Sequence, residues 1–140
     1  MPSPAHLLPA SAPVDLGSPQ TAAQALAVFF RIAARWGLSA AEKQTLLGTS
    51  RTVFFRWQSG QVAAGLDGAT AERLSYLFRI YAALQVLLPV PERADAWLRL
   101  PNSSPLFGGD TALARLLGGR VGDLKEVADL LDAQRGGDFA

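Results

Sequence analysis

Residues 97–109 read Trp97-Leu98-Arg99-Leu100-Pro101-Asn102-Ser103-Ser104-Pro105-Leu106-Phe107-Gly108-Gly109. The two prolines bound a loop and restrict it, because the proline ring fixes the backbone φ angle. We expect Trp97 and Leu100 to form the core beneath this loop and Phe107 to anchor it. The glycine pair allows a sharp turn into the next element. This stretch therefore predicts a short helix over residues 92–100, followed by an ordered loop.

Two amphipathic segments follow the loop. Asp110 is the expected N-cap of a helix that continues to about residue 117, where a pair of glycines ends it. Residues 121–134 form the expected last helix, because apolar residues recur there at helical spacing. These apolar positions are Val121, Leu124, Val127, Leu130 and Leu131. The C-terminal part of the chain, residues 89–140, is therefore predicted to be a small helical unit.

This order of features resembles the toxin-binding domain of the Xre/MbcA/ParS antitoxin family: a tryptophan, a proline-bounded loop, Phe-Gly-Gly, a short helix and a longer final helix. The likeness covers residues 97–137 and, more loosely, residues 21–88. It implies a protein toxin as partner, commonly one with a RES domain. Such toxins are similar to ADP-ribosyltransferases and act on NAD, and antitoxins of this family cover the toxin's cleft with their C-terminal region. A purely structural role would explain the same residues.

The predicted toxin-binding surface lies on the last helix and in the residues after it. Acidic side chains there would complement a basic cleft in the toxin. An aromatic residue in a glycine-rich tail is suited to anchor a partner. The alternatives are a solvated helix face and a tail without contacts. The predicted contact residues are Asp123, Glu126, Asp129, Asp132, Arg135, Gly136, Gly137, Asp138, Phe139 and Ala140.

The N-terminal half contains a pattern typical of a helix-turn-helix between residues 42 and 60. Ser39-Ala40-Ala41-Glu42 has the form of a capping box and opens a short helix that ends at Gly48. Ser50 or Thr49 then caps a second helix that stops near residue 60. Two short helices joined by a turn with a glycine are what this motif requires.

The motif looks like that of Xre-like repressors, with one departure. Gln44 occupies a position where many such motifs place alanine for close contact between the helices. The predicted packing residues are Leu46, Leu47, Val53, Phe54 and Trp57.

The second helix of the motif is the candidate DNA-reading element. A recognition helix in the major groove reads base edges with its exposed side chains, among which arginine suits guanine and glutamine suits adenine. We predict base contacts by Ser50, Arg51, Thr52, Arg56 and Gln58, and phosphate contacts by Arg31, Arg35 and Lys43. Because few of these residues are basic, specific binding would require a dimer or larger oligomer. The alternative is a hairpin that serves only as a scaffold.

Two further helices complete an all-α prediction, in which a small helix-turn-helix domain precedes a small helical toxin-binding subdomain. Thr21-Ala22-Ala23-Gln24 has the capping-box pattern, so Thr21 is the expected N-cap of a helix that ends at Gly37. Residues 69–88 form a long helix, which Pro89 terminates. Its apolar face is wider than one stripe, which predicts burial on two sides, within the fold or in a homodimer interface.

Composition limits the chemistry that the chain can perform. It has 140 residues, 49% of them hydrophobic, which suffices for one domain or two very small ones. There is no cysteine, and the single histidine, His6, lies in a proline-rich segment, residues 1–20, that we predict to be a flexible tail. We therefore predict a protein that is not an enzyme and binds no metal and no cofactor.

Charge is unevenly distributed along the chain. Residues 29–62 contain five basic residues and one acidic residue, whereas residues 109–140 contain four basic and six acidic residues. This distribution predicts two surfaces with different partners, with ordinary surface charge as the alternative. No apolar run is long enough to span a membrane, and the first 18 residues lack a secretory signal. We therefore predict a cytoplasmic protein.

The residues and the resemblance together predict an antitoxin of a type II toxin-antitoxin system. It would bind a RES-domain, NAD-consuming toxin with residues 89–140 and repress its own operon by binding operator DNA with residues 21–88. The alternative is a helix-turn-helix repressor whose C-terminal half serves only dimerisation. Truncation after Gln134 separates the two hypotheses, because only the first predicts a loss of toxin binding.

Overall fold

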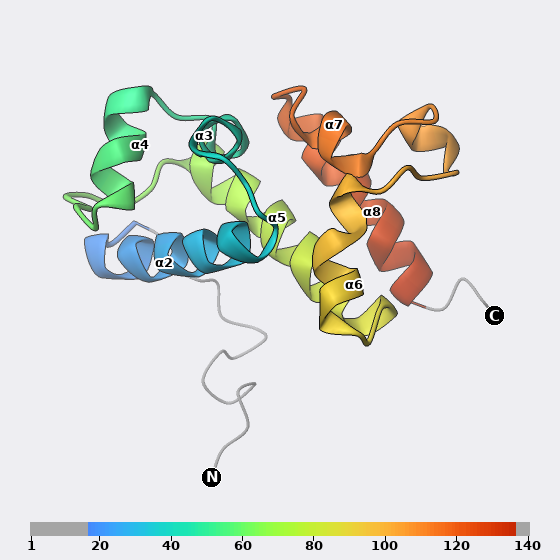
Figure 1. Ribbon diagram of the computed structural model, residues 1–140. Coiled ribbons are helices and arrows are strands. Elements are labelled where there is room, and N and C mark those ends of the chain that lie inside the picture. The colour runs from blue at the N-terminus through green and yellow to red at the C-terminus, as the bar shows by residue number, and fades with distance from the viewer. Residues whose placement is uncertain (1–16, 137–140) are drawn as a thin grey trace, which may run out of the picture.

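The computed structural model describes residues 17–136, and this part of the chain is all-α, as predicted (Figure 1). Its one isolated β-bridge joins Pro101 to Thr111 across the loop between them. The helices are α2 (Pro19–Arg35), α3 (Ala40–Leu47), α4 (Arg51–Gln58), α5 (Gly68–Leu87), α6 (Pro91–Ala96), α7 (Ala112–Leu116) and α8 (Val121–Arg135), with 3-10 turns η1 (Trp97–Arg99) and η2 (Pro105–Phe107).

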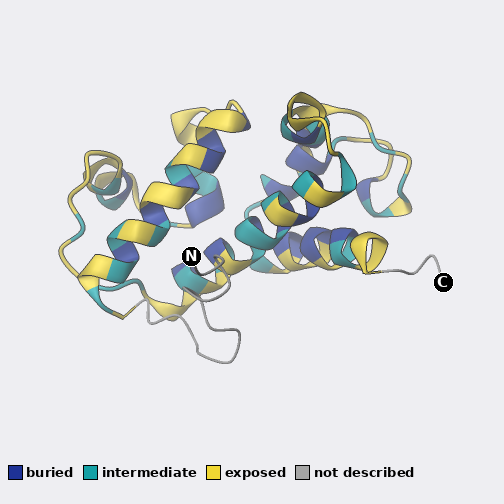
Figure 2. Ribbon diagram, turned by 90° about the horizontal axis from the view of Figure 1, so that it is seen from below, coloured by how far each residue is buried: buried dark blue, intermediate teal, exposed yellow. Residues whose placement is uncertain are grey.

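Helix α5 is the central element of the molecule. Figure 1 shows α2, α3 and α4 gathered on one side and α6, α7 and α8 on the other, with α5 running between them. Along the helices, buried stripes face inward and exposed stripes face outward (Figure 2). The fully buried residues of α5 are Leu74, Leu77, Ile80, Ala83 and Leu84. The wide apolar face of α5 is therefore buried within one chain, against helices on both sides.

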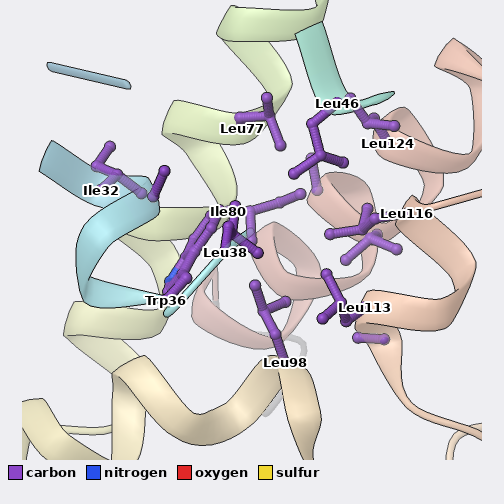
Figure 3. Close-up of a cluster of buried hydrophobic side chains, with 14 of the residues drawn as sticks. Ile32, Trp36, Leu38, Leu46, Leu77, Ile80, Leu98, Leu113, Leu116 and Leu124 are labelled. Atoms are coloured by element: carbon purple, nitrogen blue, oxygen red, sulfur yellow. The ribbon is translucent and has the colours of Figure 1, made fainter. Parts of the chain in front are cut away.

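The two halves share one hydrophobic core. Figure 3 shows Trp36 and Leu38 from the N-terminal side and Leu113 from the C-terminal side arranged around Ile80 of α5. All four side chains belong to a single cluster of buried residues. Burial of apolar surface is the main stabilising term in folding, so neither half is expected to be stable without α5 and the other half.

Helix α2 begins earlier than predicted. Ser18 is its N-cap, with Oγ accepting a hydrogen bond from the backbone N–H of Thr21 at 3.2 Å, and Pro19 occupies the first helical turn. Proline is favoured there because the first N–H groups of a helix have no helical partner. The prediction of Thr21 as N-cap was therefore wrong, and residues 19 and 20 of the expected tail belong to the helix. Residues 1–16, including His6, lie outside the described residues.

The segment before the loop also differs from the prediction. The expected helix over residues 92–100 is the short helix α6 followed by η1. A 3-10 turn has fewer residues per turn than an α-helix, so the side chains after Ala96 point in other directions than they would on a continuous α-helix. Leu98 is buried as a result, at 1% exposure, while Leu100 is 53% exposed and not a core residue. Trp97 is half-buried and packs edge-on against Phe107, with ring centroids 6.0 Å apart.

The N-cap of α7 is shifted by one residue. Thr111 caps this helix, since its hydroxyl accepts a hydrogen bond from the backbone N–H of Ala114 at 3.1 Å. The carboxylate of Asp110, the predicted cap, accepts the backbone N–H of Thr111 at 2.7 Å and so supports the cap from one residue earlier. Phe107 is buried as expected, and it anchors the loop that leads into α7.

Candidate nucleic-acid interface and toxin-binding unit

Helices α3 and α4 form the predicted helix-turn-helix. The capping box at the start of α3 is complete: the backbone N–H of Ser39 donates to Glu42 Oε1 at 2.8 Å, and the backbone N–H of Glu42 donates to Ser39 Oγ at 3.1 Å. Ser50, rather than Thr49, is the N-cap of α4 and accepts a hydrogen bond from Val53. The sequence pattern therefore predicts the start of α3, and the structure selects Ser50 from the two caps that the sequence offered for α4.

The turn between the two helices requires glycine. Gly48 has φ of +66°, a left-handed conformation that side chains with a Cβ rarely adopt. Gln44, the residue that departs from the usual alanine, donates from Nε2 to the carbonyl oxygen of Thr49 at 3.2 Å. Its side chain thus spans the turn instead of separating the helices, which explains how the motif accommodates it.

Helix α4 presents the predicted DNA-contacting residues to solvent. Phe54 is fully buried and fixes the helix against the core, while Val53 and Trp57 are half-buried. The exposed residues among those predicted to contact bases are Ser50, Arg51, Thr52, Arg56 and Gln58. Lys43 on α3 is half-buried, with its ammonium group 5.9 Å from the ring centroid of Phe30. The geometry therefore leaves α4 accessible along its length.

Most basic residues of the N-terminal half have no carboxylate partner in the structure. Within residues 17–136, Arg31, Lys43, Arg51 and Arg56 take part in no salt bridge. Arg35 is the exception in this half, because its guanidinium lies 3.7 Å from Asp95 of α6. Uncompensated cations of this kind are what neutralisation of a phosphate backbone requires.

The acidic residues of α8 are already paired within the chain. Asp123 is buried, at 4% exposure, and its carboxylate lies 3.1 Å from Arg115 Nε and 2.9 Å from Arg120 Nε. It therefore belongs to the interior, and its prediction as a residue of the toxin-binding surface was wrong. Glu126 is exposed and accepts a hydrogen bond from Arg115 at 2.6 Å. A buried carboxylate needs such cations because its ionised form loses its hydration.

Asp129 and Asp132 join α8 to α5. Arg79 of α5 donates to Asp129 Oδ1 at 2.8 Å and to Asp132 Oδ2 at 2.6 Å. Lys125 also donates to Asp129, at 2.7 Å. Hydrogen bonds from Lys125 and Arg79 lower the pKa of Asp129, and hydrogen bonds to Asp129 and Asp132 raise the pKa of Arg79. These carboxylates are therefore held in a network that a basic partner would have to compete with.

The end of α8 is the part of the predicted toxin surface that is exposed and makes no salt bridge. Arg135 and Gly136 are exposed and take part in no salt bridge among the described residues. The remaining predicted contacts, Gly137, Asp138, Phe139 and Ala140, lie outside the described residues. A second accessible feature is a hollow of about 390 Å³ beside the Phe-Gly-Gly loop, lined in part by Leu106, Thr111 and Arg115.

Two arginines that the sequence analysis did not single out join the halves of the molecule. Arg73 of α5 donates from Nη2 to the carbonyl oxygen of Gly119 at 2.7 Å and from Nη1 to that of Thr45 at 3.4 Å. Arg99 donates to the carbonyl oxygen of Gly37 at 2.7 Å and to Glu42 Oε1 at 3.3 Å. The acceptors are mostly backbone carbonyls, which every residue has, so no sequence pattern indicated these contacts.

Comparison with protein families finds two matching domain models. Residues 15–79 match the model of the antitoxin Xre-like helix-turn-helix domain, and residues 83–137 match that of the antitoxin Xre/MbcA/ParS C-terminal toxin-binding domain. The chain is also 47% identical over 113 residues to the uncharacterized protein y4oB of Sinorhizobium fredii (strain NBRC 101917 / NGR234), covering 80% of this chain and 84% of that protein. The chain belongs to the Xre/MbcA/ParS antitoxin family.

Membership implies an antitoxin that carries a helix-turn-helix, with a toxin and DNA as partners. The matched families are antitoxins and helix-turn-helix regulators and not known enzymes. Among the residues that the structure describes, no group of three or more histidine, cysteine, aspartate or glutamate side chains is arranged to hold a metal ion. No helix in that same part of the chain is long and apolar enough to cross a membrane.

Proposed function

We propose that this protein inhibits a RES-domain, NAD-consuming toxin with its C-terminal unit and represses its own operon by binding DNA through α4. The observation that carries the proposal is the match to a helix-turn-helix domain followed by a toxin-binding domain. The distribution of charge supports it, because four of the five basic residues on α2, α3 and α4 take part in no salt bridge among the described residues. The choice of a RES-domain toxin rests on the resemblance of residues 97–137 to antitoxins with such partners.

The toxin contact is proposed at the end of α8 and in the residues that follow it. Arg135, Gly136, Gly137, Asp138, Phe139 and Ala140 would cover the active-site cleft of the toxin. The rim of the same surface would include Glu126, Asp129 and Asp132. Their salt bridges with Arg115 and Arg79 would weaken their attraction to basic groups of the toxin. Asp123 is left out of this surface because it is buried.

Truncation after Gln134 tests the toxin contact without disturbing the core. The last fully buried residue of α8 is Leu131, so the shortened chain retains every buried side chain that the structure describes. The full chain, tagged at its N-terminus and purified at native level, is expected to copurify with a stoichiometric partner that mass spectrometry identifies. We expect this partner to consume NAD when free and to be inhibited by the full chain but not by the truncated one.

A matched control is Arg93→Ala, which removes an exposed arginine of α6 that takes part in no salt bridge among the described residues. This variant should inhibit the toxin as the full chain does. A partner without a RES domain would overturn the proposed class of toxin. Full inhibition by the truncated chain would overturn the proposed role of residues 135–140.

DNA binding by α4 is tested with the two arginines on its exposed face. Arg51→Ala and Arg56→Ala should each weaken binding to duplex DNA from upstream of the gene, and Arg93→Ala should not. Loss of a phosphate contact lowers the slope of log Kd against log salt by about one, whereas loss of a base contact relaxes sequence preference. Unchanged binding by both α4 variants would show that this hairpin is a scaffold.

Homodimerisation is the remaining part of the proposal. Val86 at the end of α5 and Val90 before α6 are 60% and 46% exposed, and such apolar side chains suit a contact with a second copy. This surface also supports the alternative function, a repressor whose C-terminal half serves only dimerisation. The variant Val86→Asp distinguishes the proposed antitoxin from this alternative repressor. If sedimentation shows that the variant no longer dimerises and it still inhibits the toxin, the alternative is contradicted.

A further inference from the structure

Phe55 of α4 is a large aromatic residue that the fold leaves partly exposed. Its side chain is 45% exposed, although the neighbouring Phe54 is fully buried. Successive residues of a helix are rotated by roughly 100°, so the buried side of α4, at Val53, Phe54 and Trp57, lies opposite Thr52 and Phe55. Phe55 therefore lies on the face of α4 that is turned away from Val53 and Trp57, with its ring partly covered by Phe54.

The ring of Phe55 is held in place by its neighbours. It packs edge-on against Phe54, with ring centroids 5.2 Å apart and an interplanar angle of 67°. The guanidinium carbon of Arg51, one turn earlier, lies 5.4 Å from the centroid of the Phe55 ring. The exposed ring is thus fixed between a core residue and a cation, and little side-chain entropy remains to be lost when it contacts a ligand.

The surroundings of Phe55 favour duplex DNA as its ligand. Arg51 lies against the ring and Arg56 is the next residue along α4, and neither takes part in a salt bridge within residues 17–136. A hollow of about 220 Å³ next to it is lined by Ala40, Ala41, Gln44, Arg51, Phe54 and Phe55. An apolar ring beside an arginine that has no carboxylate partner matches the major groove, where the C5-methyl group of thymine is the apolar feature between two phosphate backbones.

We propose that Phe55 is a specificity-determining residue, which contacts the C5-methyl group of a thymine next to the guanine bound by Arg51. This inference rests on the proposed DNA binding by α4 and adds a base preference to it. Each half-site of the operator then contains a thymine and a guanine in adjacent base pairs. A protein partner would be met by a broader apolar surface than Ala40, Ala41 and Phe54 provide beside Phe55, and the neighbours of Phe55 along α4, Thr52, Arg56 and Ser59, are polar and exposed.

The test removes one methyl group from the DNA. The full chain is used to select bound duplexes from a random-sequence pool, and each thymine of the selected site is then replaced by uracil, which differs only by the C5-methyl group. We expect one uracil replacement per half-site to weaken binding about three- to tenfold, the effect of losing one buried methyl contact. Other replacements should change the Kd less than twofold.

Phe55→Ala should weaken binding to the thymine site and lose the sensitivity to uracil at that position. Phe55→Leu should retain part of both. Val28→Ala on α2, which also removes an exposed apolar side chain, is the matched control and should bind as the unaltered chain does. Thermal unfolding of each variant shows that it is folded, and the uracil comparison on the unaltered chain needs no variant at all.

Each outcome decides between the inference and the proposed function. Specific binding without any uracil-sensitive thymine, or with the same uracil effect in Phe55→Ala, overturns the inference while DNA binding stands. Loss of toxin inhibition in Phe55→Ala, with unchanged DNA binding, makes the ring a protein contact and likewise overturns it. If no sequence is enriched from the pool, specific DNA recognition itself fails, and the role of Phe55 fails with it.

Discussion

At the residue scale, Gly48 links the turn of the helix-turn-helix to α5. Its φ is +66°, and a Cβ added to it would lie 2.6 Å from Arg73 Nε and 2.9 Å from Arg73 Cζ. Gly48→Ala therefore combines backbone strain, about 1–2 kcal/mol for the left-handed conformation, with displacement of Arg73. We expect the free energy of unfolding, measured with urea, to fall by more than the strain alone.

Gly108→Ala is the matched control for this substitution. Gly108 has a similar conformation, with φ of +56°, but no heavy atom lies within 4 Å of the added Cβ. Gly108→Ala should therefore introduce the backbone strain without displacing another side chain. Its loss in free energy of unfolding should be smaller than that of Gly48→Ala. Equal losses would contradict a role of the Arg73 contact in the turn.

At the scale of the element, the N-terminus of α3 makes stability depend on pH. Glu42 accepts a hydrogen bond from the backbone N–H of Ser39, and this bond, with the charge of Arg99, lowers the pKa of Glu42 below its ordinary value of 4.5. A carboxyl group whose pKa is lower in the folded state binds its proton more readily when unfolded. The stabilisation of the folded state by Glu42 is therefore complete above pH 4.5. It is lost as the pH falls through the lower pKa that Glu42 has in the folded protein.

Glu42→Gln tests this dependence, because glutamine keeps the shape and an acceptor oxygen but not the charge. We expect the unfolding free energy of the variant to be lower than that of the unaltered chain at pH 7. The difference should narrow in acid, where Glu42 becomes protonated in the unaltered chain too. A difference that stayed constant from pH 7 to pH 3 would show that the charge of Glu42 contributes nothing.

The helix ends also show which features the sequence predicts. The capping box at Ser39 is reciprocal and local, so four residues suffice to predict it. The start of α2 was misplaced because two caps compete there: Ser18 with Pro19 provides a cap oxygen and a preset first turn, whereas Thr21 provides only the oxygen. Local patterns predict that a helix exists, and competition among neighbouring caps decides where it begins.

The charged residues show where prediction from sequence ends. Asp123 was predicted to lie with Glu126 on the toxin-binding surface, yet it is buried between Arg115 and Arg120. Helical periodicity predicts which face of one helix is buried. It does not predict where the arginines of neighbouring segments lie relative to that helix. The exposure of the polar residues of α4 was predictable, because it depends on this helix alone: its polar residues and its packing residues lie on different faces.

At the scale of the whole molecule, the shared core predicts that the two family domains unfold together. Leu124 of α8 and Leu46 of α3 are both fully buried in the cluster that surrounds α5. Leu124→Ala should lower the free energy of unfolding by about 2–5 kcal/mol, the range for such a truncation in a core. In hydrogen exchange, amides of α4 should lose protection by the same amount as amides of α8, although α4 is in the other domain.

Exchange that increased only in α7 and α8 would contradict this coupling and would make the two domains independent.

Coupled exchange has a consequence for the proposed function. Arg73 joins the C-terminal end of α3 to Gly119, just before α8, and Arg99 joins the start of α3 to η1. A toxin that bound and stabilised α8 would then also stabilise α3 and α4, because a ligand that binds only the folded form shifts every unfolding equilibrium that includes its site. The toxin complex should accordingly show slower exchange in α4 than the free protein does.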